Sequence, residues 1–253
     1  MNSSTGLRRF ISGPPSAAQA GAVPNQALPD QAAPDHARPD QAVPDQSGQA
    51  QAPAAEKCDL CATEVPAEHS HLADLDQSSL LCACRACYLL FTHTEAARGR
   101  YRAVPDRYLA DPDHPLSAAE WDELEVPVGL AFFLRSSRQS TVTGFYPSPA
   151  GATECRLDLA AWDRLTAAHP LLGAAAPDVE AVLITRSGQG PSGLGPSETA
   201  IECFVVPIDA CYELAGRMRL HWRGFDGGAE ARGAIAEFLD DVRARARTLD
   251  QES

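Results

Sequence analysis

The 253-residue sequence has no long apolar run and almost no lysine. Its apolar stretches, such as 126–134, are much shorter than the about 18 residues that mark a transmembrane helix, so no membrane span is expected. Lysine occurs once, as Lys57, against 20 arginines in an alanine-rich chain. That imbalance is typical of a GC-rich coding bias, so the arginine content says little about function.

Positive charge is also scarce. The chain carries 21 Lys and Arg against 34 Asp and Glu, a net charge of -13, and residues 58–125 are the most acidic part. Nucleic-acid affinity depends on basic side chains that displace counterions from phosphates. A DNA or RNA partner is therefore not expected.

An export signal is incomplete. Arg8 and Arg9 resemble a twin-arginine signal, but no apolar segment of about 7 to 15 residues follows them. We therefore expect a cytoplasmic protein, in which eight cysteines serve as ligands, reactive thiols or core residues rather than disulfides. The segment Leu7–Ile11, which contains Arg8-Arg9-Phe10, could instead be a docking peptide at the tip of the tail.

Familiar catalytic signatures are missing as well: there is no nucleophile elbow, zinc-protease helix or kinase motif set. Cys211 could act as a nucleophile only if a base such as His221 approached it, and Cys155, Cys203 and Cys211 are more simply core residues. The glycine-rich segment 222–228 could cradle a phosphate, although a turn between helices is the simpler interpretation. An enzyme is thus an alternative without direct support.

Composition divides the chain into four parts. Residues 1–56 contain a proline-rich repeat of period five, which predicts a disordered tail. Residues 57–95 form a cysteine- and histidine-rich module, 96–125 an acidic connector with a capping box at Ser117, and 126–250 a larger domain.

Two C-x-x-C pairs within the module predict a metal site. In each pair, a tight turn or the first turn of a helix lets both sulfurs reach one ion, and two pairs complete a tetrahedral four-thiolate site. A knuckle at the first pair, a hairpin turning at 76–78 and a helix from the second pair give a treble-clef-like layout. The predicted ligands are Cys58, Cys61, Cys84 and Cys87.

Zinc is the expected metal, with iron or an iron-sulfur cluster as the alternative that four thiolates also allow. Cys82 lies two residues from Cys84 and could replace it as a ligand. His69 and His71 share one face of a strand and could be substitute ligands or hydrogen-bond the thiolates. His93 is expected to be solvated.

The larger domain is predicted to be α+β, with a mainly antiparallel sheet and helices on one face, because its elements do not alternate strictly. Strands are expected at 126–134, 141–146, 154–159, 180–186 and 200–206, and helices at 159–168, 209–219 and 229–249. Asp209 is the expected cap of the second of these helices.

The segments 58–91, 146–155, 178–181, 207–214 and 222–228 resemble an uncharacterised family encoded beside actinobacterial high-affinity nickel-iron hydrogenase genes. The resemblance covers most of residues 58–248 and implies an accessory role, with a hydrogenase or its maturation machinery as protein partner. It assigns no activity. We therefore expect a zinc-binding accessory protein, or alternatively an iron-sulfur or rubredoxin-like electron carrier.

Overall fold

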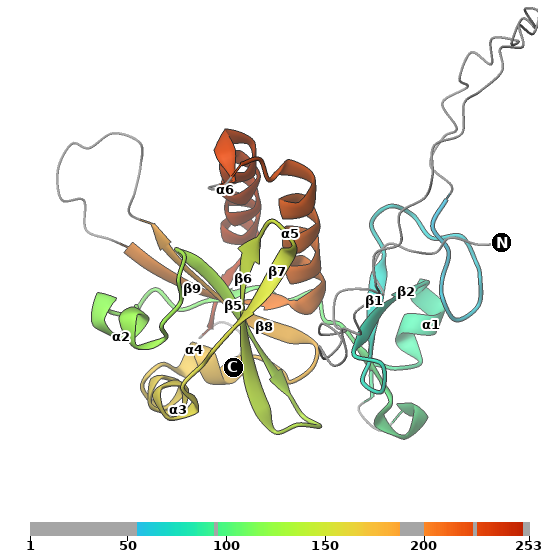
Figure 1. Ribbon diagram of the computed structural model, residues 1–253. Coiled ribbons are helices and arrows are strands. Elements are labelled where there is room, and N and C mark those ends of the chain that lie inside the picture. Colours follow the sequence, from blue (N-terminus) through green and yellow to red (C-terminus); the bar gives the residue numbers. More distant parts are fainter. Residues whose placement is uncertain (1–54, 94–95, 188–199, 225–226, 250–253) are drawn as a thin grey trace, which may run out of the picture.

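The computed structural model describes residues 55–93, 96–187, 200–224 and 227–249 (Figure 1). The predicted tail, with its repeat and its Arg8-Arg9-Phe10 segment, lies outside these residues except for its last two positions. Within the described ranges, no helix combines the length and the apolar character that crossing a bilayer requires.

A seven-stranded sheet organises the larger unit, in the order β10-β4-β9-β8-β5-β6-β7. Its neighbours are antiparallel except for β10 and β4, so the predicted α+β class with a mainly antiparallel sheet is confirmed. The strands are β4 (Leu109–Ala110), β5 (Leu130–Ser136), β6 (Thr141–Ser148), β7 (Gly151–Cys155), β8 (Glu180–Ser187), β9 (Ala200–Pro207) and β10 (Arg247–Thr248).

Helices cover both faces of this sheet, not one face as the sequence suggested (Figure 1). Phe132 of β5 packs with α5 (Ile208–His221) and α6 (Gly228–Arg245). The next residue, Phe133, points to the opposite face and packs with α3 (Leu159–Ala168). Residues 181–184 of β8 are all buried because alternate side chains enter different cores. Two short helices complete the second face: α2 (Ala118–Glu123) and α4 (Pro170–Ala174).

Several helices and strands begin or end at other residues than predicted. The strand expected to reach residue 159 ends at Cys155, because Asp158 caps α3 by accepting a hydrogen bond from the Ala160 N–H. Helix α6 ends at Arg245, and β10 follows it. The expected cap Asp209 lies inside the first turn of α5, which begins after Pro207.

A smaller three-stranded sheet carries the cysteine-rich module. Its strands β1 (Ser70–Asp74), β2 (Ser79–Ala83) and β3 (Tyr101–Ala103) have the order β2-β1-β3, and α1 (Arg85–Leu89) covers one face. The predicted knuckle, hairpin and helix are all present. Residues 96–125, expected as a connector, supply strands to both sheets: β3 pairs with β1, and β4 pairs with β9. The 3-10 turn η1 (Ala96–Gly99) directly precedes β3 in the chain.

One face of the small sheet packs against the larger unit. Ala73 and Leu80 form a buried cluster with Val179 and Ile208, residues at the beginnings of β8 and α5. The opposite face, with Leu72 and its neighbours, packs against α1. Alternation along β1 therefore sends one set of side chains toward the larger unit and the other toward the helix.

Candidate metal centre

The first cysteine pair lies on a tight knuckle. The Ala62 N–H donates to the Cys58 carbonyl and the Cys58 N–H to the Thr63 carbonyl, both at 2.8 Å. Ala62 adopts a left-handed φ of 62°, which reverses the chain within these few residues. The knuckle therefore presents the sulfurs of Cys58 and Cys61 from one turn.

The second pair lies where β2 passes into α1. Cys84 is the N-cap of α1, and its sulfur accepts a hydrogen bond from the Cys87 N–H at 3.5 Å. A cap residue and the residue three positions later lie on the same side of the first turn. This arrangement directs both sulfurs toward the knuckle.

Asp59 fixes the knuckle to β2. Its backbone N–H donates to the Cys82 carbonyl, and its carboxylate accepts from the Cys82 N–H, both at 2.8 Å. Because Cys82 lies two residues before Cys84, the N-cap of α1, these two hydrogen bonds hold the knuckle beside the beginning of α1.

The four predicted ligands come together. The sulfurs of Cys58, Cys61, Cys84 and Cys87 all lie within 4.8 Å of one another. Cys61 Sγ and Cys84 Sγ are 3.7 Å apart. A tetrahedral ion with metal–sulfur bonds of about 2.3 Å would place its sulfurs about 3.8 Å apart. The geometry thus fits a single ion held by both pairs.

The electrostatics of the cluster also favour a cation. Hydrogen bonds with the Thr63 side chain and backbone lower the pKa of Cys61 to about 6. Burial and the neighbouring thiols raise the pKa of Cys87 to about 12. The Cys61 thiol therefore ionises more easily than the Cys87 thiol, because a second negative charge close to the first is unfavourable. A bound cation would relieve this repulsion and let all four ionise.

Cys82, His69 and His71 form a separate group. Their ligand atoms lie within 4.8 Å of one another, and the group does not include any of the four clustered cysteines. Cys82 is therefore not placed as a substitute for Cys84. His93 is exposed, as expected.

Sequence reasoning missed Asp209 as a partner of this second group. His71 Nδ1 lies 2.9 Å from Asp209 Oδ2, although 138 residues separate them. Burial opposes protonation of His71, but hydrogen bonds with Asp209 and Cys82 outweigh it and raise the pKa of His71 to about 9. No local pattern could have found this pair, since Asp209 lies in α5 of the other unit.

The enzyme candidates of the larger unit are not supported by their surroundings. Cys211 is buried, which raises the pKa of its thiol, and His221 lies ten residues further along α5, or roughly 15 Å. In the glycine-rich segment 222–228, of which residues 225 and 226 are not described, the Arg223 N–H donates a hydrogen bond to the Gly227 carbonyl at 3.0 Å. This hydrogen bond closes a turn.

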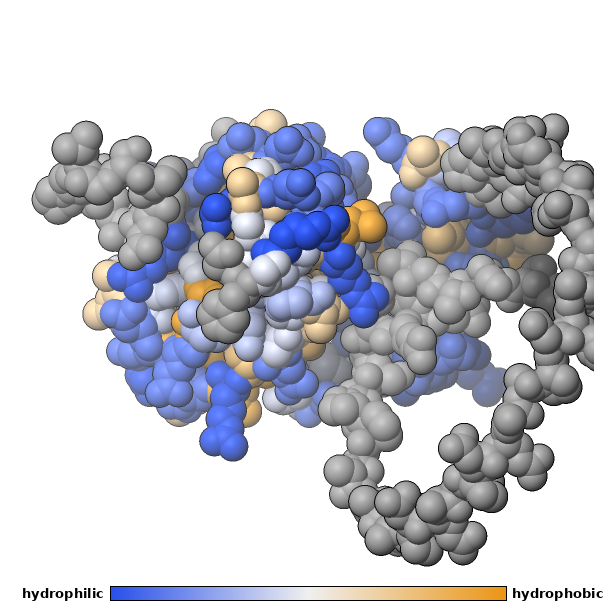
Figure 2. All heavy atoms as spheres, turned by 45° about the horizontal axis from the view of Figure 1, so that its top comes forward, coloured by the Kyte–Doolittle hydropathy of each residue, from blue (hydrophilic) through white to orange (hydrophobic). Residues whose placement is uncertain are grey.

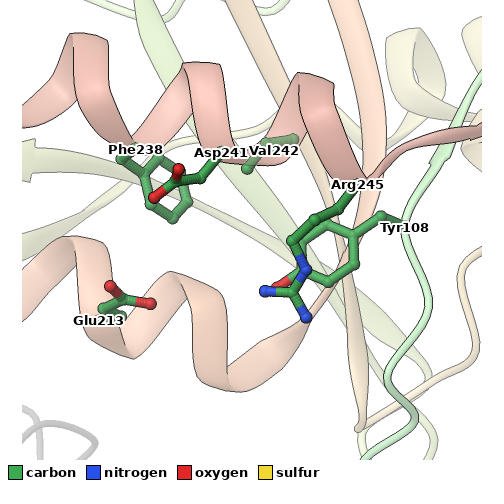
Figure 3. A pocket seen from close by; sticks show the side chains of 6 residues that line it. All are labelled: Tyr108, Glu213, Phe238, Asp241, Val242 and Arg245. Carbon is green, nitrogen blue, oxygen red and sulfur yellow. The ribbon is translucent and has the colours of Figure 1, made fainter.

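Two hollows in the larger unit are small. One lies between α5, α6 and Tyr108, where Arg245 covers the Tyr108 ring with its guanidinium carbon 3.9 Å from the ring centroid (Figure 3). The other lies beside Phe133 and Trp162. Each has a volume of about 30 Å³, room for about one water molecule.

Fold and site together define a two-part protein, in which a four-cysteine module compatible with metal binding packs on an α+β domain. The chain belongs to a family of unknown function (DUF5947), whose family model matches residues 57–246. The expected membership in an uncharacterised family is thus confirmed. Neither a curated protein nor a solved structure matches the chain.

Proposed function

We propose that this protein is a zinc-binding accessory protein of the cytoplasm that acts through a protein partner, a nickel-iron hydrogenase or its maturation machinery. The observation that carries the metal assignment is the convergence of four sulfurs, from two segments over 20 residues apart, within 4.8 Å. The hydrogenase partner rests on the sequence resemblance described above.

A structural role for zinc is favoured by the closed ligand set. Four thiolates leave no coordination position for a substrate, which is typical of structural zinc. Among the described residues, the cluster under α1 has three buried members, Leu72, Leu81 and Ala83. So small a core supplies little stabilisation, and metal binding would supply folding free energy of about 10 kcal/mol or more.

Partner binding is supported by exposed apolar side chains beside the cysteines. Leu60 lies inside the knuckle, and Leu89 and Leu90 end α1 with exposed fractions of 50% and 67%. Elsewhere hydrophilic residues cover much of the face of the larger unit that Figure 2 shows. Apolar side chains that the fold leaves in water are candidates for a protein contact.

The metal proposal is tested on protein purified without oxygen. Elemental analysis of wild type should find zinc, in a colourless sample, and Cys84→Ser should lose one tightly bound ion per chain. Cys155→Ser is the control, because Cys155 lies in β7 of the larger unit. Visible charge-transfer absorption would identify an iron centre instead, and an unchanged metal content in Cys84→Ser would refute the site.

The partner proposal is tested by binding to purified hydrogenase and to its maturation proteins. Leu90→Glu should weaken binding at least tenfold by placing a charge in the contact. Leu220→Glu is the matched control, since Leu220 is 69% exposed but lies on α5. Equal binding by wild type and Leu90→Glu, or no binding by wild type, would contradict the proposal.

A further inference from the structure

The face of the small sheet turned toward the larger unit carries two histidines and a cysteine. His71 of β1 lies directly opposite Cys82 of β2 in the antiparallel register. His69 precedes His71 by two residues, and their ring centroids are 4.7 Å apart. Strand geometry thus brings one thiol and two imidazoles together on the same face as Ala73 and Leu80.

Both histidines are oriented through Nδ1. His69 Nδ1 is 2.9 Å from the Pro66 carbonyl oxygen, and His71 Nδ1 is 2.9 Å from Asp209 Oδ2. These acceptors call for a proton on each Nδ1, so Nε2 is the atom that each ring offers to the group. A carbonyl or carboxylate that accepts from one ring nitrogen while the other binds metal is the usual arrangement of ligand histidines.

The surroundings of His69 Nε2 indicate that this group binds a ligand. It is buried and has no hydrogen-bond partner among the described residues, and the His69 side chain is only 6% exposed. A buried acceptor without a partner costs roughly 1–3 kcal/mol. An ion between His69, His71 and Cys82 would satisfy this nitrogen.

We propose that His69, His71 and Cys82 form a second metal site, which binds a divalent cation of the zinc class and keeps one coordination position open. Two imidazoles and one thiolate suit borderline-soft ions such as Zn²⁺ and Co²⁺. Three protein ligands leave the fourth position to water or to an external ligand. The metal binds the thiolate of Cys82 and the unprotonated Nε2 of each ring, and protons on these atoms pass to water on binding.

This site goes beyond the structural zinc proposed above, because an open position allows the ion to exchange or to contact a partner. A competing interpretation is a catalytic arrangement, in which Cys82 is a nucleophile, His71 its base and Asp209 the carboxylate that orients the base. That arrangement leaves His69 Nε2 unexplained, whereas a metal ion accounts for all three side chains.

The test is an anaerobic titration of metal-free full-length protein with Co²⁺, followed by visible absorption. Wild type should bind two equivalents, one with the intense bands of four thiolates and one with a weaker thiolate band. Cys82→Ser and His69→Gln should each bind one equivalent and keep the four-thiolate bands, while circular dichroism confirms folding. His93→Gln, at an exposed histidine of the same module, should still bind two.

Asp209→Asn provides a variant outside the ligand set. It should weaken the second site by about 10- to 100-fold and leave the four-thiolate bands unchanged. The inference is overturned if wild type lacks the weaker band or if Cys82→Ser retains it. It is also overturned if Cys82 is alkylated equally fast with and without Co²⁺, the result expected of a free nucleophile. If wild type shows the weaker band but not the four-thiolate bands, the first metal site is refuted and the second is not.

Discussion

Arg107 binds both carboxylate oxygens of Glu180. Arg107 Nε donates to Oε1 at 2.8 Å and Nη2 to Oε2 at 2.6 Å, and the Glu180 side chain is fully buried. The Ala176 N–H also donates to Oε2, at 2.7 Å. Because Arg107 precedes β4 and Glu180 begins β8, this pair ties the segment between the two sheets to the centre of the larger one.

Removing Arg107 should therefore destabilise the larger unit strongly. Arg107→Ala leaves a buried carboxylate without its counter-charge, which typically costs about 3–5 kcal/mol of unfolding free energy. Urea unfolding followed by tryptophan fluorescence measures this cost. Arg164→Ala is the control, because Arg164 and Glu123 form an exposed pair worth less than about 1 kcal/mol. Similar losses in both variants would contradict the role of Glu180.

Glu120 should make stability depend on acid pH. Its hydrogen bond with His169, together with those from Ser117, lowers its pKa to about 2 from an ordinary value of 4.5. A lowered pKa means that protonation favours the unfolded state. The stabilisation is therefore complete above pH 4.5 and is lost as the pH falls toward 2.

Glu120→Gln tests this sign. The variant should lose about 1–3 kcal/mol of unfolding free energy at neutral pH, because a charged hydrogen-bond acceptor is removed. The difference from wild type should shrink between pH 4.5 and pH 2. Chemical denaturation at a series of pH values checks it, and a difference that stays constant down to pH 2 would count against the pKa assignment.

The sequence predicted those features that depend only on residues close together in the chain. The turn at 76–78 was expected between two apolar runs, and β1 and β2 lie on either side of it. The capping box of Ser117 and Glu120 is present, with both reciprocal hydrogen bonds. The cluster of four cysteines could also be predicted, because a single turn brings together the two sulfurs of each C-x-x-C pair.

Distant pairings left no such signal. Strands β4 and β10 have two residues each and pair with each other across more than 130 positions of the chain, too short for any periodicity. The contact of His71 with Asp209 likewise depends on how the two units pack. The sequence therefore predicted the four clustered cysteines but not the carboxylate that contacts His71 in the second group.

Gly144 should not tolerate a side chain. A Cβ atom there would lie 2.6 Å from Cys155 Sγ and 3.0 Å from the Phe133 ring, so Gly144→Ala should cost about 1–3 kcal/mol by overpacking. Gly216→Ala is the matched control: its Cβ meets nothing within 4 Å in helix α5, and alanine should stabilise by about 0.5–1 kcal/mol. Thermal unfolding distinguishes the two, and a loss at both positions would contradict the difference in packing.

Metal removal should unfold the small module and spare the larger unit. In the described part of the chain, the apolar cluster beneath α1 has three buried residues, whereas the clusters on the two faces of the large sheet have sixteen and fifteen. With excess chelator, amide hydrogen exchange should rise sharply in β1, β2 and α1. Trp121 and Trp162 are buried in the larger unit, so tryptophan fluorescence should stay native.

Zinc should restore protection in wild type but not in Cys84→Ser. A chelator-induced change in tryptophan emission would show instead that the contact of Ala73 and Leu80 with Ile208 makes the two parts unfold as one.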